Sequence, residues 1–341
     1  MRKVAVFFFV VIIFAYASGY AQQLPDAVGA EIVKLRSGTP QERKDAALAL
    51  RGEDSKDAVS ALIEALQDKD SSVSYAAIEA LGISLDPRAS DALWEYLKAS
   101  EADVNIQYAI AQALGKTSDP RILANARIFI KDPAKKAAGL FLLQEFDDPA
   151  VIDVLIGALS DDNESFRESV AEAITAKGRM AGAQDKLIGA LKDANPQVRF
   201  YSAGILGQVQ SQRATPPLIT LLKDENVKVR YMAVWALGNL HDPRAIEPLI
   251  ESLRDRDPEV RGKVALVLGS SGDTRAVEPL IACAKDKDDY VRSSVIGALQ
   301  LSADPRAEKT FRAAVFDGNE AVRANAARGL KALQEAGEAK P

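Results

Sequence analysis

The chain has 341 residues, of which 48% are hydrophobic, 27% charged and only 6% aromatic, and its formal net charge is -5. Its single cysteine excludes an intrachain disulfide framework, and its single histidine excludes iron sites that need paired histidines. An alanine- and leucine-rich composition with little β-branched alternation favours an all-α protein.

Residues 1–21 have the three parts of a secretory signal peptide. A basic start, Arg2-Lys3, precedes an apolar run from Val4 to Phe14, and Gly19-Tyr20-Ala21 places small residues at the -3 and -1 positions of a cleavage site. We expect cleavage before Gln22 and a periplasmic or secreted mature protein. An uncleaved anchor is the alternative, but the apolar run is short for a bilayer span, so no stable membrane insertion is expected after cleavage.

The rest of the chain is built from a unit that repeats about every 31 residues. Val229-Arg230 recurs as Val260-Arg261, and Ala236-Leu237-Gly238 recurs as Val267-Leu268-Gly269. A fixed period of this size indicates a solenoid of stacked supersecondary units. The position of the first residue of the Val-Arg pair, here termed the Val position, recurs at Glu42, Val73, Ile106, Lys135, Phe166, Val198, Val229, Val260, Val291 and Val322, which defines ten units.

Each unit is predicted to contain two helices. Asp-Pro pairs such as Asp242-Pro243 supply an N-cap and a proline at the first helical position, so the first helix begins there. The second helix contains the Val position and carries apolar or small residues 4, 5, 7 and 8 positions later, which is helical spacing. The glycines nine positions after the Val position are predicted to be left-handed C-caps, and they are Gly82, Gly115, Gly207, Gly238 and Gly269.

Charged residues also recur with the period. An aspartate stands five residues before the Val position, at Asp68, Asp161, Asp193, Asp224, Asp255, Asp286 and Asp317. Arginine follows the Val position at Arg167, Arg199, Arg230, Arg261, Arg292 and Arg323. We interpret these arginines as a structural ladder to the aspartates of neighbouring units. Because the arginines are spread singly beside acidic residues, and signal cleavage would change the charge from -5 to -7, no nucleic-acid partner is expected.

The recurring segments D-P-R-A, P-L-I, D-x-x-x-x-V-R and A-L-G resemble the HEAT repeat, specifically its short phycobilisome-lyase type. The resemblance covers residues 26–333 and implies a right-handed α-solenoid that serves as a binding scaffold. We therefore expect a solenoid over residues 22–333, followed by a polar tail at 334–341. Lys135-Lys136 and Lys177-Gly178-Arg179 depart most from the repeat pattern.

No motif for catalysis, metal binding or cofactor binding stands out from the repeats. Cys-x-x-Cys, Gly-x-Ser-x-Gly and phosphate-binding glycine loops do not occur, and acidic pairs in the turns are explained by capping. We expect a non-enzymatic scaffold without a cofactor, monomeric by itself. The alternatives are an assembly subunit of a cell-envelope complex and a lyase-type enzyme related to the phycobilin lyases.

The expected binding surface is the concave face formed by the second helices. Residues 2 and 6 positions after the Val position should point away from the core, since they are i, i+4 neighbours off the apolar stripe. Aromatic residues gather at or beside these positions, and the candidate partner-binding residues are Tyr75, Tyr108, Phe200, Tyr201, Tyr231 and Trp235. Ordinary packing between neighbouring repeats is the alternative role for these side chains.

Overall fold

The computed structural model describes residues 27–338 except residues 100–102, 118, 147 and 181, so the predicted signal peptide and its cleavage site lie outside the described residues. Within the described ranges every regular element is a helix, which confirms the predicted all-α class. A helix over residues 27–37 precedes the labelled elements.

The helices alternate in the order that the repeat predicts. The second helices of successive repeats are α2 (Pro40–Ala49), α4 (Ser71–Leu81), α6 (Val104–Gly115), α8 (Lys136–Glu145), α10 (Glu164–Lys177), α12 (Pro196–Gln208), α14 (Val227–Leu240), α16 (Pro258–Ser271), α18 (Asp289–Ser302) and α20 (Glu320–Glu338). The first helices after residues 27–37 are α3 (Lys56–Ala65), α5 (Pro87–Ala99), α7 (Arg121–Phe129), α9 (Val151–Ala158), α11 (Ala183–Ala190), α13 (Thr215–Leu221), α15 (Ile246–Ser252), α17 (Val277–Cys283) and α19 (Glu308–Ala314). The last helix continues to Glu338, so the first residues of the predicted polar tail are helical.

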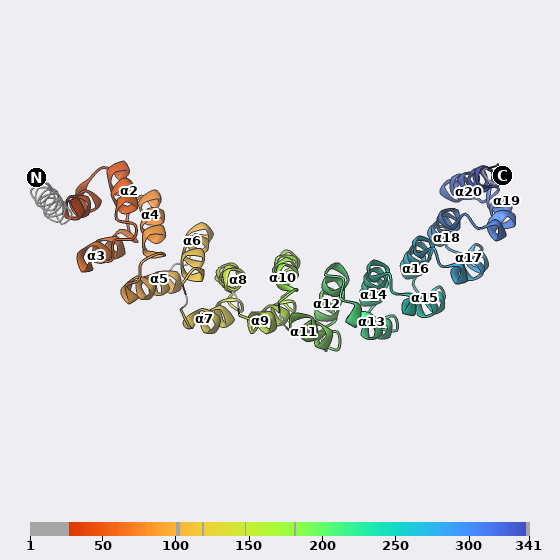
Figure 1. The fold of residues 1–341 in the computed structure, drawn as a ribbon, viewed down its shortest axis with the longest axis horizontal. Coiled ribbons are helices and arrows are strands. Elements are labelled where there is room, and N and C mark those ends of the chain that lie inside the picture. The colour runs from red at the N-terminus through yellow and green to blue at the C-terminus, as the bar shows by residue number, and fades with distance from the viewer. Residues whose placement is uncertain (1–26, 100–102, 118, 147, 181, 339–341) are drawn as a thin grey trace, which may run out of the picture. The chain divides into compact units, whose positions relative to one another are not determined.

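The chain forms two compact units, which we call the N-terminal unit (up to Val151) and the C-terminal unit (from Ile152). Within each unit the second helices form one row and the first helices another (Figure 1). In the C-terminal unit the row from α10 to α20 lies on the inner side of that unit's curve.

The Asp-Pro turns begin first helices, as predicted, and a short 3-10 helix precedes four of the first helices, two of them at the Asp-Pro pairs Asp242-Pro243 and Asp304-Pro305. Short 3-10 helices, η1 (Gln212–Ala214), η2 (Pro243–Ala245), η3 (Thr274–Ala276) and η4 (Pro305–Ala307), precede α13, α15, α17 and α19. Asp242 caps η2 by accepting a hydrogen bond from the backbone N–H of Arg244, whose guanidinium also pairs with the same carboxylate. This side-chain pair lowers the pKa of Asp242, so the cap stays ionised.

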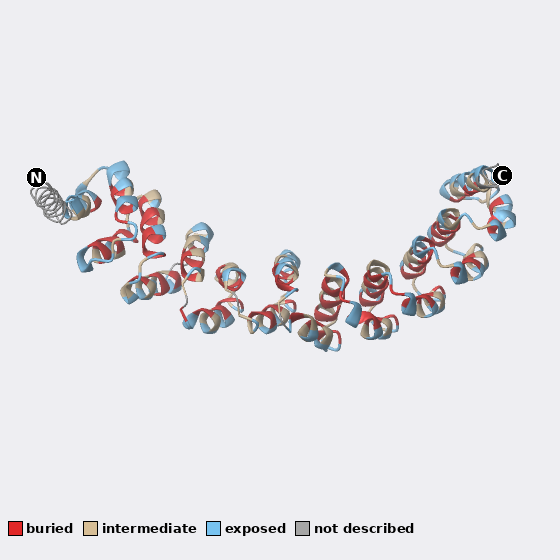
Figure 2. Ribbon diagram, in the orientation of Figure 1, coloured by how far each residue is buried: buried red, intermediate tan, exposed pale blue. Residues whose placement is uncertain are grey.

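The core lies between the two rows of helices, where the buried residues face one another (Figure 2). The predicted stripe is buried: Ala233, Val234, Ala236 and Leu237 of α14 are each at most 1% exposed. Burying such a stripe against the neighbouring helices supplies most of the stability that a short helix lacks by itself.

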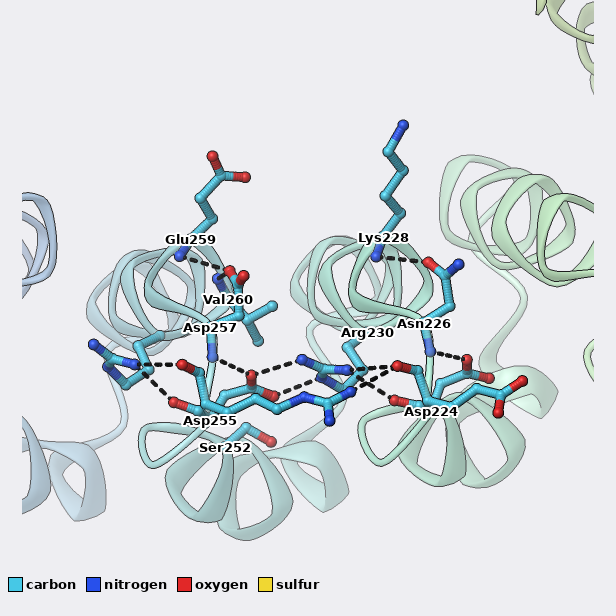
Figure 3. A network of polar contacts seen from close by, with 12 residues as sticks. Asp224, Asn226, Lys228, Arg230, Ser252, Asp255, Asp257, Glu259 and Val260 are labelled. Carbon is cyan, nitrogen blue, oxygen red and sulfur yellow. Dashed lines mark hydrogen bonds and ion pairs between the residues drawn. The ribbon is translucent and has the colours of Figure 1, made fainter.

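The predicted arginine ladder joins successive repeats through paired hydrogen bonds (Figure 3). Arg230 donates from Nε and Nη2 to the two carboxylate oxygens of Asp255 in the next repeat, at 2.7 and 2.9 Å. Its Nη1 donates to the backbone carbonyl of Asp224 in its own repeat, at 2.9 Å. The same pairing joins Arg43 to Asp68, Arg199 to Asp224, Arg261 to Asp286 and Arg292 to Asp317.

The ladder fails at Arg167, contrary to the prediction. The interval from Phe166 to Val198 is one residue longer than the usual 31, so the repeat aspartate, Asp193, stands 26 residues after Arg167 instead of the 25 that separate the paired residues elsewhere. Arg167 keeps its bonds to the carbonyls of its own turn, but its buried Nε has no hydrogen-bond partner among the described residues. The step from α10 to α12 therefore lacks the pair that joins the later repeats.

The predicted left-handed conformation of the repeated glycines is wrong, although Gly82 does occupy the C-cap of α4, with φ -65°. Gly207, Gly238 and Gly269 lie inside α12, α14 and α16, and the left-handed residues that follow are Gln210, His241 and Gly272. The glycines are needed because the next second helix packs directly against them. A Cβ on Gly269 would lie 2.6 Å from both the Cα and the Cβ of Ala298 in α18.

We expect loss of one ladder partner to destabilise the stack strongly. In Asp255→Ala a buried guanidinium stays unpaired, and its uncompensated charge should lower the free energy of unfolding by about 3 kcal/mol. Glu64→Ala removes the exposed pair with Arg36 and should cost less than about 1 kcal/mol. Urea unfolding followed by circular dichroism, with hydrogen exchange in α14 and α16, measures the difference. Equal small effects of the two variants would contradict the structural role of the ladder.

Helix packing against the glycines makes a second prediction. Gly269→Ala should destabilise the protein by about 1 to 3 kcal/mol, because the methyl group meets the backbone of α18. Gly189→Ala is the matched control: it lies in α11 with nothing within 4 Å of an added Cβ, so it should stabilise by about 0.5 kcal/mol or more. Thermal denaturation distinguishes the two, and a stabilising Gly269→Ala would show that the close approach imposes no constraint.

Candidate functional site: an aromatic groove on the second helices

Four of the six predicted aromatic residues line a single groove in the C-terminal unit. Phe200 and Tyr201 come from α12, and Tyr231 and Trp235 from α14. The groove has a volume of about 760 Å³ and runs over the second helices from α10 to α16. All four side chains are half-buried, so part of each ring is open to solvent.

The helical repeat places these rings on the groove side. Tyr231 and Trp235 lie one turn apart, 2 and 6 positions after Val229, and so point off the buried stripe. In α12 the position equivalent to Trp235 is Gly204, where an added Cβ would lie 3.1 Å from the sulfur of Met232. The missing side chain lets Met232 reach across from α14 and form part of the apolar floor.

Neighbouring side chains fix the orientation of the rings. Phe200 and Tyr201 pack edge to face, with centroids 5.1 Å apart at 89°. The guanidinium of Arg167 lies 5.9 Å from the ring centre of Tyr201, and the ammonium of Lys263 lies 5.7 Å from that of Tyr231. Because cations favour the faces of aromatic rings, both tyrosines are held before any ligand arrives. Arg167, the residue that the ladder leaves incompletely paired, thus takes a second role beside the groove.

The polar atoms of the groove are available for a ligand. Burial, and to a smaller degree Tyr290 and Glu259, raise the pKa of Tyr231, so its hydroxyl remains a neutral donor. Within the described part of the chain no residue makes a hydrogen bond with the hydroxyls of Tyr201 and Tyr231 or with the indole N–H of Trp235. Such apolar rings with polar tips are typical of interface anchors.

The two remaining candidates, Tyr75 and Tyr108, belong to the N-terminal unit and do not line this groove. Tyr75 lines a second groove of about 510 Å³ over α2, α4 and α6, together with Lys44 and Lys116. Tyr108 is 42% exposed and packs edge to face on Phe141, with ring centroids 4.3 Å apart. The six candidate residues therefore do not line one common groove.

Sequence reasoning missed the polar and flexible residues of the groove. Glu172 of α10, Gln208 of α12 and Lys263 of α16 line it with Met232. Lys263 and Met232 stand three positions after the Val position, as Tyr201 does. From this shared position in the repeat, Lys263 and Met232 could have been predicted to lie beside Tyr201 on the groove.

Two further properties of the described residues bear on the class of site. They contain no group of three or more histidine, cysteine, aspartate or glutamate side chains placed to hold a metal ion. Cys283 is half-buried, and burial raises the pKa of its thiol.

None of the helices in the described ranges combines the length and the apolar character that a bilayer crossing requires.

The stacked helix pairs define the chain as an all-α solenoid, and comparison with known proteins identifies its family. A family model described as HEAT repeats matches residues 31–115, 184–257, 215–300 and 278–341, together more than half of the chain. The chain therefore belongs to the HEAT repeat family. No curated protein sequence matches it.

Solved structures of the karyopherin Kap121p are similar in fold. Kap121p bound to Nup53p matches with a TM-score of 0.64 at 13% identity, over 92% of this chain and 43% of that chain. Kap121p bound to Ste12p matches with a TM-score of 0.63 at 13% identity, over 92% and 42%. The complex with the extreme C-terminus of the protein phosphatase Cdc14p has a TM-score of 0.62 at 13% identity, over 92% and 43%. The chain thus spans less than half the length of these proteins.

Proposed function

We propose that the protein is a non-enzymatic scaffold that binds a partner protein in the aromatic groove of the C-terminal unit. The observation that carries the proposal is the gathering of Phe200, Tyr201, Tyr231 and Trp235 in one groove, half-open to solvent, with their polar tips unbonded within the described residues. The resemblance in fold to Kap121p, solved with Nup53p, Ste12p and a terminal segment of Cdc14p, supports a role in holding segments of other proteins.

The energetics of interfaces support the groove over the rest of the surface. Tryptophan and tyrosine bury a large apolar area while losing little rotamer freedom, so they dominate binding energy. Exposed apolar residues elsewhere, such as Leu85 and Phe316, stand outside the two grooves described above. Single exposed residues of this kind are common on protein surfaces.

The groove hypothesis is tested by truncating its rings. Tyr231→Ala and Trp235→Ala should each weaken partner binding by about 2 kcal/mol, roughly thirtyfold, because each removes an anchor. Phe316→Ala is the control: this ring is 86% exposed outside the groove and should leave binding unchanged. Co-purification from the native host followed by mass spectrometry identifies the partner, and titration with that partner measures affinity.

Thermal denaturation of the same variants separates binding from folding. If the rings only fill space between repeats, their truncation should lower stability by about 3 kcal/mol or more without selective loss of a partner. That result, or undiminished binding, would assign the contacts to other surfaces and favour a subunit that assembles an envelope complex through its edges.

We further propose that the repeats are of the short phycobilisome-lyase type and that the protein works outside the cytoplasm as a monomer. The period of about 31 residues and the signal-like residues 1–21 support these two points. Native mass spectrometry of protein from the fractionated host should find a monomer that begins at Gln22 outside the cytoplasm. A full-length chain in the cytosolic fraction would falsify export.

A further inference from the structure

We propose that the ligand of the aromatic groove is a proline-rich segment in the polyproline II conformation that carries a basic residue at one end. This inference rests on the proposed function, since it names the class of partner for the same groove. It follows from the backbone of the groove, its hydrogen-bond donors, the spacing of its helices and its charges.

The backbone around the groove excludes recognition by strand addition. Residues from α10, α12, α14 and α16 line it, and the lining residues lie within these helices. Inside a helix the backbone N–H and C=O groups bond to one another, so none is offered to a β-strand. The ligand must therefore be recognised by side chains.

The unbonded donors favour an extended ligand over a helical one. Tyr201, Tyr231 and Trp235 each present an O–H or N–H that no residue of the described ranges accepts. A helical ligand uses its own carbonyls internally, so covering these donors would remove them from water without compensation. A polyproline II segment has no internal hydrogen bonds, and its carbonyls are free to accept them.

The repeat distance of a polyproline II segment also matches the spacing of the helices that line the groove. A polyproline II helix returns to the same side after three residues, and with a rise of about 3.1 Å per residue it advances about 9 Å. Helices packed against each other, as α12 and α14 are, generally have axes about 8 to 10 Å apart. Residues i and i+3 of the segment can therefore contact the rings of α12 and α14 in turn, as in other aromatic-lined grooves that bind proline-rich segments.

The exposed carboxylates beside the groove determine where a basic residue of the ligand should bind. Glu168 and Glu172 lie one turn apart on α10, both are exposed, and neither pairs with a cation among the described residues. Arg167 of α10 is buried, so the two carboxylates are the charges that α10 exposes here, and they attract an arginine or lysine of the segment. On the α16 side the ammonium of Lys263 lies over Tyr231. There the exposed carboxylate of Glu259, which also acts on Tyr231, offsets the charge of Lys263.

Synthetic peptides test this class of ligand. One peptide carries prolines at i and i+3 with an arginine at one end, a second has those prolines replaced by alanine, and a third is an amphipathic helix of leucine and lysine. Binding is followed by isothermal titration and by tryptophan fluorescence. Trp94, the other of the two tryptophans, is 1% exposed in the N-terminal unit, so a change in quenching reports Trp235.

The first peptide should bind selectively, and Trp235→Ala should weaken it about thirtyfold. Glu172→Gln should weaken the arginine peptide several-fold at low salt, but not a version with alanine in place of arginine. Phe316→Ala should change neither interaction. Tighter binding of the alanine or helical peptide would overturn the proline-rich class.

Comparing the natural partner protein with the synthetic peptides distinguishes a failure of this inference from a failure of the proposed function. If the natural partner still depends on Tyr231 and Trp235 but no proline-rich peptide binds, the class of ligand is wrong and the groove remains the site. If neither partner nor peptide depends on these rings, both proposals fail.

Discussion

The paired hydrogen bonds between an arginine of one repeat and an aspartate of the next are the interaction that orders much of this protein. Each guanidinium spans two repeats, since it also holds the carbonyls of its own turn. Burial of the pair is costly unless all its donors and acceptors are satisfied, so a slipped neighbour would leave an unpaired charge. The ladder therefore fixes the register of one repeat on the next, while apolar burial supplies most of the attraction.

Close packing imposes a second constraint on the same interface. Gly207 and Gly269 lie where the next second helix approaches, and an added methyl group would meet its backbone. The arginine sets the register and the glycine allows the approach. The arginine and the glycine both contact the neighbouring repeat, which explains why they recur with the period.

The aromatic groove spans the step where the regular interface is modified. One extra residue between Phe166 and Val198 displaces the aspartate that Arg167 would bind, and the guanidinium lies instead beside the ring of Tyr201. Gly204 then removes a side chain from the middle of α12, which opens space above Met232. The proposed binding surface thus coincides with a local departure from the repeat, as is expected where function competes with regular packing.

The sequence by itself determined the repeat, the two helices of each unit, the buried stripe and most of the ladder, because these depend on spacing within a helix or on a period that many copies share. It also placed Phe200, Tyr201, Tyr231 and Trp235 on one side of their helices. Only the tertiary structure decided that these four share a groove while Tyr75 and Tyr108 do not, that Lys263 lies on Tyr231, and that the repeated glycines are contact points instead of left-handed caps. Those features depend on distances between residues in different repeats, and the local pattern of a single repeat carries no measure of how closely its neighbour packs.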